Sequence, residues 1–148
     1  MLGPESAAID EVIEWRGERR VENPRPEDGL ASSLKVGLAA VSNDAGGALI
    51  LLADQPRVRS IVIRRIVDTW RGGPAPIVAP RYSRDGAPNP VLIDRTAWPL
   101  AYALQGDRGM GPVLAEQQML VRWVDVAGDN PDVDTRADLE RLTEEGLP

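Results

Sequence analysis

The sequence predicts an α/β domain, built as a three-layer α/β/α sandwich around a mostly parallel sheet. The first observation is an unbroken apolar run at residues 48–53, which two glycines precede and Asp54-Gln55-Pro56 ends. A run of this length between turn signals is typical of a strand buried on both faces. The second observation is the helical spacing of the next apolar positions, which are Ile63, Ile66, Val67 and Trp70. A buried strand followed by an amphipathic helix is half of a βαβ unit, which favours a parallel sheet.

Two helices are expected before this strand. The first contains the apolar residues of 9–13, and the second buries a stripe formed by Leu34, Leu38 and Val41. Residues 27–33 form the loop between them, and Ser32 or Ser33 is placed to cap the second helix.

Strands and short helices follow the central unit. Strands are expected at residues 76–80, 89–93 and 120–126, and short helices at residues 98–104 and 110–114. Asp85-Gly86 is a hairpin-turn signal, which predicts one antiparallel excursion in the sheet.

The last predicted helix begins after Thr135. Thr135 and Asp138 have the spacing of a capping box, with Asp in place of the usual Glu. Leu139 and Leu142 are the expected buried contacts of this helix.

Composition restricts the chemistry. The 148 residues are enough for one domain with a real core, expected over 1–148. A formal net charge of −6 argues against nucleic acid as a partner. The absence of cysteine and histidine excludes disulfides, thiolate or imidazole metal sites and Ser-His catalysis. Any bound metal is therefore expected to be a hard cation held by oxygen.

The expected compartment is the cytoplasm. No apolar run is long enough to span a bilayer, and the first five residues have no basic region or apolar signal core. These observations predict neither a membrane partner nor secretion.

Four carboxylates in loops are candidates for metal or substrate binding, namely Asp54, Asp107, Asp132 and Asp134. Asp54 follows the carboxyl end of the apolar strand, where ligands bind in open α/β sheets, although its spacing alone slightly favours a turn or helix-cap role. Asp107 lies in a glycine-containing turn with Gly106 and Gly109, which favours close approach of a ligand or of another backbone segment. Asp132 and Asp134 are assigned a structural role near a helix N-terminus.

Residues 29–33 form a second candidate site. A Gly- and Ser-containing loop that leads into a helix N-terminus binds anions through free backbone N–H groups, or simply caps the helix.

Six segments, in this order, resemble the MobA-like NTP transferases, which include the cytidylyltransferases of molybdenum-cofactor maturation. They are Asn23-Pro24 with Gly29 to Leu34, Leu51 to Pro56, Ile77 to Tyr82, Asn89 to Leu92, Gly106 to Gly109, and Asp132 to Leu139. Each is a weak signal alone, but together they cover nearly the whole chain. The resemblance implies a Rossmann-like nucleotide-diphospho-sugar transferase fold.

The resemblance also implies a reaction. An acceptor phosphate such as that of molybdopterin attacks the α-phosphate of an NTP with Mg²⁺, and pyrophosphate leaves. CTP is the first choice of nucleotide and GTP the alternative. Asp54 would hold Mg²⁺ and, with Asp107, be catalytic. The remaining implied positions are Gly29, Ser32 and Ser33 for the nucleotide, and Asn89, Gly106 and Gly109 for the acceptor.

One family feature has no match in this sequence. The family's glycine-rich triphosphate loop, L-A-A-G-x-S-x-R-M-G, is absent, and Met1-Leu2-Gly3 resembles the end of the family's second strand. The fold is therefore expected to be N-terminally truncated, without its first βα unit. Three alternatives follow: an enzyme with little activity, an inactive remnant that associates with itself through an exposed sheet edge, or a longer protein whose start site is misassigned.

Overall fold

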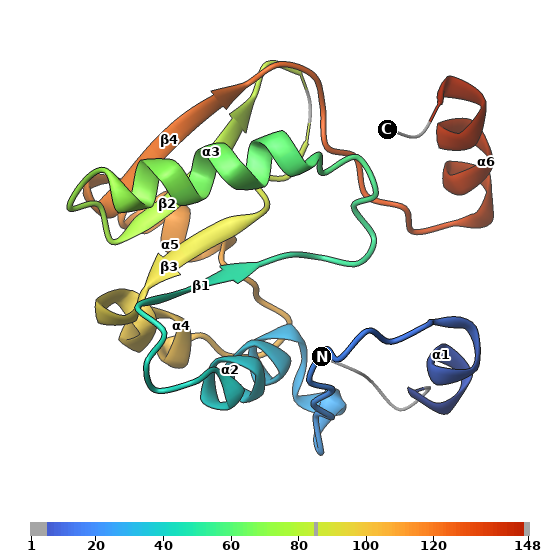
Figure 1. Cartoon of the computed structure of the whole chain (residues 1–148), viewed down its shortest axis with the longest axis horizontal. Coiled ribbons are helices and arrows are strands. Elements are labelled where there is room, and N and C mark those ends of the chain that lie inside the picture. The colour runs from blue at the N-terminus through green and yellow to red at the C-terminus, as the bar shows by residue number, and fades with distance from the viewer. Residues whose placement is uncertain (1–5, 85, 147–148) are drawn as a thin grey trace. The chain divides into compact units, whose positions relative to one another are not determined.

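The computed structural model describes residues 6–84 and 86–146, which divide into two compact units (Figure 1). The helical unit comprises Met1–Ala45 with Trp98–Glu116, and the sheet unit comprises Gly46–Ala97 with Gln117–Pro148. These are units of packing, and the single domain expected over 1–148 stays a prediction. The strand end expected at residues 1–3 and the first residue of the Asp85-Gly86 turn lie outside the described residues.

The sheet unit contains a mixed four-stranded sheet of order β1–β3–β2–β4. β1 (Gly47–Ile50) and β2 (Ile77–Tyr82) each pair antiparallel with β3 (Val91–Asp94). β4 (Val121–Val126) pairs parallel with β2 along six residues. Strands β1, β2 and β4 therefore run in one direction and β3 alone is reversed. The predicted α/β class with one antiparallel excursion is confirmed.

β1 differs from its prediction. It ends at Ile50 rather than at residue 53, and it lies at an edge of the described sheet with all four residues only half-buried. Leu51, the next residue, is 48% exposed. The prediction that this strand is buried on both faces is therefore wrong. A strand with a neighbour on one side only is less covered than a central strand, and the apolar run in the sequence does not reveal which position the strand takes in the sheet.

Helix α3 (Ser60–Arg71) lies across one face of this sheet (Figure 1). Its expected amphipathic spacing is confirmed, since Val62 and Ile66 are buried against the strands. The strand residues in this core are Val78, Leu92, Val124 and Val126. Residues that alternate to the other face of β2 and β3 are also fully buried, namely Ile77, Ala79, Val91 and Ile93. Both faces of the two middle strands are thus covered, as a layered sandwich requires.

The helical unit contains α1 (Ser6–Val12), α2 (Leu30–Ala40), α4 (Trp98–Ala103) and α5 (Gly111–Glu116). α2 packs against α4, with Ala31, Leu38 and Ala101 buried. The chain of this unit also forms a 3₁₀ turn, Pro26–Asp28, directly before α2.

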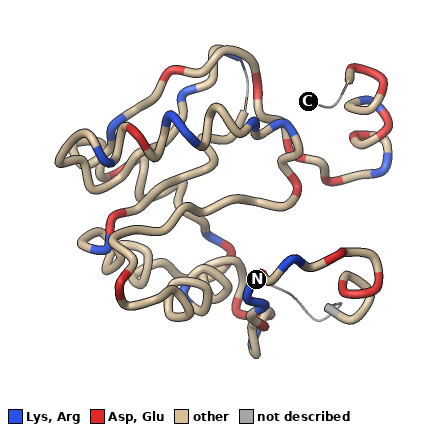
Figure 2. Tube along the Cα trace, in the orientation of Figure 1, with Lys and Arg blue, Asp and Glu red and all other residues tan. Residues whose placement is uncertain are grey.

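The last helix, α6 (Arg136–Glu145), belongs to the sheet unit and carries charges of both signs (Figure 2). Its predicted capping box is confirmed, since Thr135 and Asp138 exchange hydrogen bonds at its N-terminus. Leu142 is 1% exposed as expected, but Leu139 is 47% exposed, so the prediction that Leu139 is buried is wrong. In the part of the chain that the structure describes, no helix has the length and apolar character needed to cross a membrane.

Candidate functional site

The carboxyl end of β1 brings Asp54 beside the loop that follows β4. The backbone N–H of Val133 donates to the carbonyl oxygen of Asp54 at 2.8 Å, so the two loops run side by side. Because β1 and β4 point in the same direction, both loops leave the sheet at the carboxyl ends of these strands. The side chain of Asp54 is exposed, and its predicted role in ligand binding stays a prediction.

Asp132 is the second carboxylate in these loops. Its Oδ1 accepts a hydrogen bond of 2.6 Å from Nε2 of Gln55, the residue that follows Asp54. Asp132 is itself exposed, whereas Gln55 is only 4% exposed. The sequence predicts a structural role for Asp132, and its position in the loop after β4, which runs parallel to β2, is the feature that places it beside Gln55.

A buried amide underlies these loops. Asn130 is fully buried, and its side-chain nitrogen lies 3.0 Å from Oε1 of Gln55. The same nitrogen lies 3.2 Å from the carbonyl oxygen of Ala87 and 3.3 Å from that of Asn89. Oδ1 of Asn130 is buried without a hydrogen-bond partner among the described residues.

Asn89, predicted to bind the acceptor, lies in the loop between β2 and β3. Its carbonyl oxygen also accepts from the hydroxyl of Tyr82 at 2.9 Å. Burial raises the pKa of Tyr82, so the phenol stays protonated and able to donate. Gly86, in the same loop, forms an isolated β-bridge with Asn130. The segment that carries Asn89 is therefore attached to the loop that carries Asp132.

Arg57 joins three parts of the sheet unit. Its guanidinium pairs with Asp129 at 3.0 Å and with Glu145 in the last turn of α6. The hydrogen bonds that Arg57 donates, first to Glu145 and then to Asp129, raise its pKa above the usual value. A permanent positive charge thus lies in the loop that follows Asp54.

The helical unit brings Gly29 and Gly106 into direct contact. The N–H of Ala31 donates to the carbonyl oxygen of Gly106 at 3.0 Å, and the N–H of Leu30 donates to Oδ1 of Asp107 at 3.3 Å. Asp107 therefore caps the N-terminus of α2 from outside the helix, where a negative charge is favourable. Gly109 lies against Leu30, since a Cβ atom at this glycine would lie 3.1 Å from Cδ2 of that leucine.

Ser32 and Ser33 lie in the first turn of α2, so the expectation that they cap this helix is wrong. The N-cap residue is Gly29, with no side-chain cap. The amide of Asn23, 7% exposed, donates to both hydroxyls, at 2.6 Å to Ser32 and 3.0 Å to Ser33. Ser32 in turn donates to the carbonyl oxygen of Gly29 at 2.8 Å.

The structure thus groups the predicted site residues within each unit. Asp54 and Asn89 lie in the sheet unit, at loops linked through Gln55 and Asn130. The other six lie around the N-terminus of α2 and the turn after α4 in the helical unit, and are Gly29, Ser32, Ser33, Gly106, Asp107 and Gly109.

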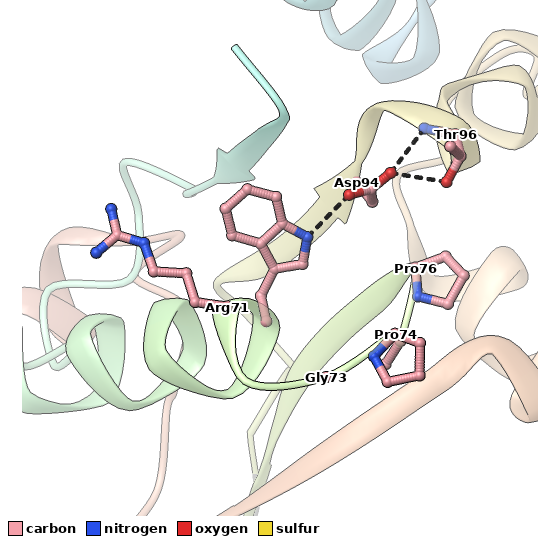
Figure 3. A pocket seen from close by; sticks show the side chains of 8 residues that line it. Arg71, Gly73, Pro74, Pro76, Asp94 and Thr96 are labelled. Carbon is pink, nitrogen blue, oxygen red and sulfur yellow. Dashed lines mark hydrogen bonds between the residues drawn. The ribbon is translucent and has the colours of Figure 1, made fainter.

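A cavity of about 440 Å³ lies at the opposite end of the sheet, and the sequence analysis did not anticipate it. Trp70, Arg71, Asp94 and Thr96 line it together with the proline-containing turn 73–76 (Figure 3). Asp94 accepts from the indole of Trp70 at 3.0 Å and from Thr96. The N–H and then the hydroxyl of Thr96, followed by Trp70, hold the pKa of Asp94 below its usual value.

The carboxylate oxygens of Asp54 and Asp132, in the loops that follow β1 and β4, are donors of the kind that a hard divalent cation prefers. No cluster of three or more acidic, cysteine or histidine side chains that could hold a metal occurs in the described ranges. Two exposed carboxylates from adjoining loops are nevertheless sufficient for Mg²⁺, which usually takes one or two protein carboxylates and completes its shell with water and substrate phosphates.

Comparison with known proteins identifies the family of the chain. The family model described as "MobA-like NTP transferase domain" matches residues 4–121. Among curated proteins, no match of significance is found.

Three solved structures are similar along nearly the whole chain. A structure of Rv0371c from Mycobacterium tuberculosis H37Rv in complex with manganese has 32% identity and a TM-score of 0.80, with 97% of this chain and 75% of that chain covered. A second structure of Rv0371c has 31% identity and a TM-score of 0.83, with 96% and 72% covered. An Rv0371c homolog from mycobacterium sp. strain JC1 has 27% identity and a TM-score of 0.81, with 97% and 71% covered. The predicted fold is confirmed, and the chain belongs to the MobA-like NTP transferase family.

Proposed function

We propose that the domain is a divalent-cation-dependent nucleotidyltransferase that moves an NMP from an NTP to a phosphate-bearing acceptor. The observation that carries this proposal is the pairing of two loops at the carboxyl ends of β1 and β4, which places the exposed residues Asp54 and Asp132 on adjoining segments of a MobA-like domain. Hard oxygen donors next to an open strand end suit a cation that is shared with phosphates.

In this proposal, Asp54 and Asp132 hold Mg²⁺, with Asp132 added to the ligand predicted from sequence. A cation held by these residues would neutralise charge on the phosphates. An acceptor phosphate oxygen forms a bond to the α-phosphorus, and the bond to the β-phosphate oxygen breaks, so that pyrophosphate leaves. Phosphoryl transfer of this kind depends on positioning and charge, which is compatible with a chain that has no histidine. The manganese in the Rv0371c complex supports use of a divalent cation.

The remaining predicted positions keep their proposed roles. Gly29, Ser32 and Ser33 contact the nucleotide, while Asn89, Gly106 and Gly109 contact the acceptor. Asp107 stays a proposed catalytic residue, and its Oδ1 accepts from the N–H of Leu30. CTP and molybdopterin are the first choice of substrates, in cytoplasmic molybdenum-cofactor biosynthesis, and GTP is the alternative nucleotide.

The test is pyrophosphate release from CTP or GTP, with Mg²⁺ or Mn²⁺ and with or without molybdopterin. Turnover by these 148 residues is expected to be small, because the sequence has no match to the triphosphate loop. Each charge-assisted hydrogen bond that such a loop would supply contributes about 1.5–3 kcal/mol. Acceptor-dependent release that Asp54→Asn abolishes supports the proposal. Failure of the protein to bind either cation contradicts it.

A second proposal concerns association between copies of the chain. Strand β1 has one neighbour in the described sheet, and it contains no charged residue or proline that would discourage strand addition. The other edge strand, β4, carries the exposed charges of Arg122 and Asp125. This contrast supports pairing of two copies through β1. The alternative function is a catalytically inactive binding module that associates with itself.

A further inference from the structure

We propose that Gln55 and Asn130 form a buried relay that positions Asp132 and links the proposed cation site to the loop of Asn89. The inference rests on the proposed function for the identity of the ligand at Asp132. Its geometry depends only on hydrogen bonds within the sheet unit, whose described residues supply every contact.

The relay has a fixed direction. Nε2 of Gln55 donates to Asp132 at 2.6 Å, and Oε1 of Gln55 accepts from Asn130 at 3.0 Å. A reversed Gln55 amide would present its oxygen to the carboxylate of Asp132 and its nitrogen to the nitrogen of Asn130. Both contacts would then be repulsive, so Asn130 holds Gln55 in the orientation that binds Asp132.

Asn130 is itself held by the backbone. Its amide nitrogen lies within 3.3 Å of the carbonyl oxygens of both Ala87 and Asn89. Its own backbone leaves no room beside Gly86, where an added Cβ atom would lie 2.5 Å from the nitrogen of Asn130. With Asn130 fully buried and Gln55 4% exposed, water has little access to compete for these bonds.

The consequence is a route from Asp132 to Asn89 that passes through two neutral amides. Fixing one oxygen of Asp132 on Gln55 leaves its other oxygen for the cation. Groups that orient metal ligands in this way typically change metal affinity by 10- to 100-fold when they are removed. A movement of Asp132 on cation binding is transmitted to the carbonyl oxygen of Asn89, next to the side chain proposed to meet the acceptor.

The experiment uses the full chain with Gln55→Met, which keeps the side-chain length and removes both polar atoms. Mn²⁺ affinity is measured by electron paramagnetic resonance, and thermal stability is measured on the same samples. The relay predicts roughly tenfold weaker Mn²⁺ binding by the folded variant. Unchanged affinity, with or without a lower thermal midpoint, overturns the proposal, since a purely structural Gln55 affects folding alone.

Tyr82→Phe is the matched control. It removes the 2.9 Å hydrogen bond to the same carbonyl of Asn89 but leaves in place the hydrogen bonds that join Asn130, Gln55 and Asp132. Mn²⁺ affinity is expected to stay within twofold of the parent protein. An equal loss in Tyr82→Phe and Gln55→Met would mean that any loosening of this loop weakens the site, which contradicts a specific relay. Should Gln55→Met fail to fold, Gln55→Ala, which admits water to Asn130 and Asp132, is expected to show the same loss.

A second measurement tests the link to Asn89. In Mg²⁺ titrations of ¹⁵N-labelled protein, the amide resonances of Asp54 and Asn89 are expected to shift together. In Gln55→Met the shift at Asn89 is expected to disappear, while Asp54 still responds at higher Mg²⁺. An Asn89 shift of undiminished size in the variant overturns the link.

A metal-free measurement separates failure of the relay from failure of the proposed function. Side-chain amide protons of Gln55 are expected to exchange with solvent at least tenfold faster in Asp132→Ala than in the parent protein. If exchange is unchanged, the contact that the relay requires is absent. If exchange accelerates but the parent protein binds neither Mn²⁺ nor Mg²⁺, the relay stands as a positioning device and the proposed nucleotidyl transfer fails.

Discussion

Gly29 and Gly106 approach so closely that a Cβ atom built on Gly29 would lie 2.5 Å from the carbonyl carbon of Gly106. This contact fixes the turn after α4 against the first turn of α2, and the hydrogen bond from Ala31 to Gly106 is formed beside it. Position 29 requires glycine for two reasons: the contact with Gly106 leaves no room for a Cβ atom, and a φ of +84° is unfavourable for other residues.

We therefore expect Gly29→Ala to destabilise the protein. Backbone strain of this kind costs about 1–3 kcal/mol, and the clash with Gly106 adds to it. Each kcal/mol corresponds to a fall of about 2–4 °C in the thermal midpoint for a chain of this size. Gly17→Ala is the control, because Gly17 has φ +102° but open space around it. Equal midpoints for the two variants would show that the contact with Gly106 contributes nothing.

Asp54→Asn and Asp132→Asn are each expected to weaken divalent-cation binding. Each variant removes one of two anionic ligands, so the loss should exceed the roughly tenfold loss typical of an outer contact. Titration calorimetry with Mn²⁺ measures it. Asp134→Asn makes the same change of charge two residues beyond Asp132 and should leave the affinity nearly unchanged. A similar loss in all three variants would point to general electrostatic attraction and not to ligation.

The carboxylate of Asp94 predicts a dependence of stability on pH. Its pKa in the folded protein is lowered, chiefly by hydrogen bonds from Thr96, so its ionised form stabilises the fold. That contribution is complete above the unfolded pKa of about 3.9 and disappears as the pH falls through the lower folded value. Asp94→Asn should therefore have a lower thermal midpoint than the parent protein at pH 7, and the difference should shrink below about pH 4. A difference that is constant from pH 7 to pH 3 would contradict this assignment.

Association through β1 predicts a concentration-dependent dimer that a charge disrupts. Leu51→Lys places an ammonium group directly after the edge strand, where Leu51 is 48% exposed. We expect the dimer dissociation constant to rise by about tenfold or more, equivalent to about 1.4 kcal/mol. Light scattering after size-exclusion chromatography measures this change. Met119→Lys, at a side chain that is 96% exposed, is the control and should dimerise normally. If the parent protein stays monomeric at high concentration, the proposed association through β1 is contradicted.

Local signals were sufficient to predict much of the fold. The capping box of Thr135 and Asp138 depends on residues three apart, and the boundaries of β4 follow from apolar residues beside turn residues. The helical spacing from Ile63 to Trp70 gave α3 within three residues of its start. In each case the determining interactions lie within one element or against one face of it, so a short window of sequence contains them.

Relationships between distant segments could not be predicted in the same way. The hydrogen bond from Gln55 to Asp132 joins residues that are 77 positions apart, and the sequence near either residue does not predict it. Ser32 and Ser33 were expected to cap α2, but Asp107 supplies a carboxylate from a separate turn and the helix begins earlier. The edge position of β1 depends on which strands are available to pair, a property of the whole sheet.

Arg57 connects the loop after Asp54 with Asp129 and with Glu145 at the end of α6. Loss of α6 would remove Glu145 and leave the guanidinium of Arg57 with the ion pair to Asp129. The last turn of α6 therefore restrains the segment that follows Asp54, although the two lie far apart in the sequence.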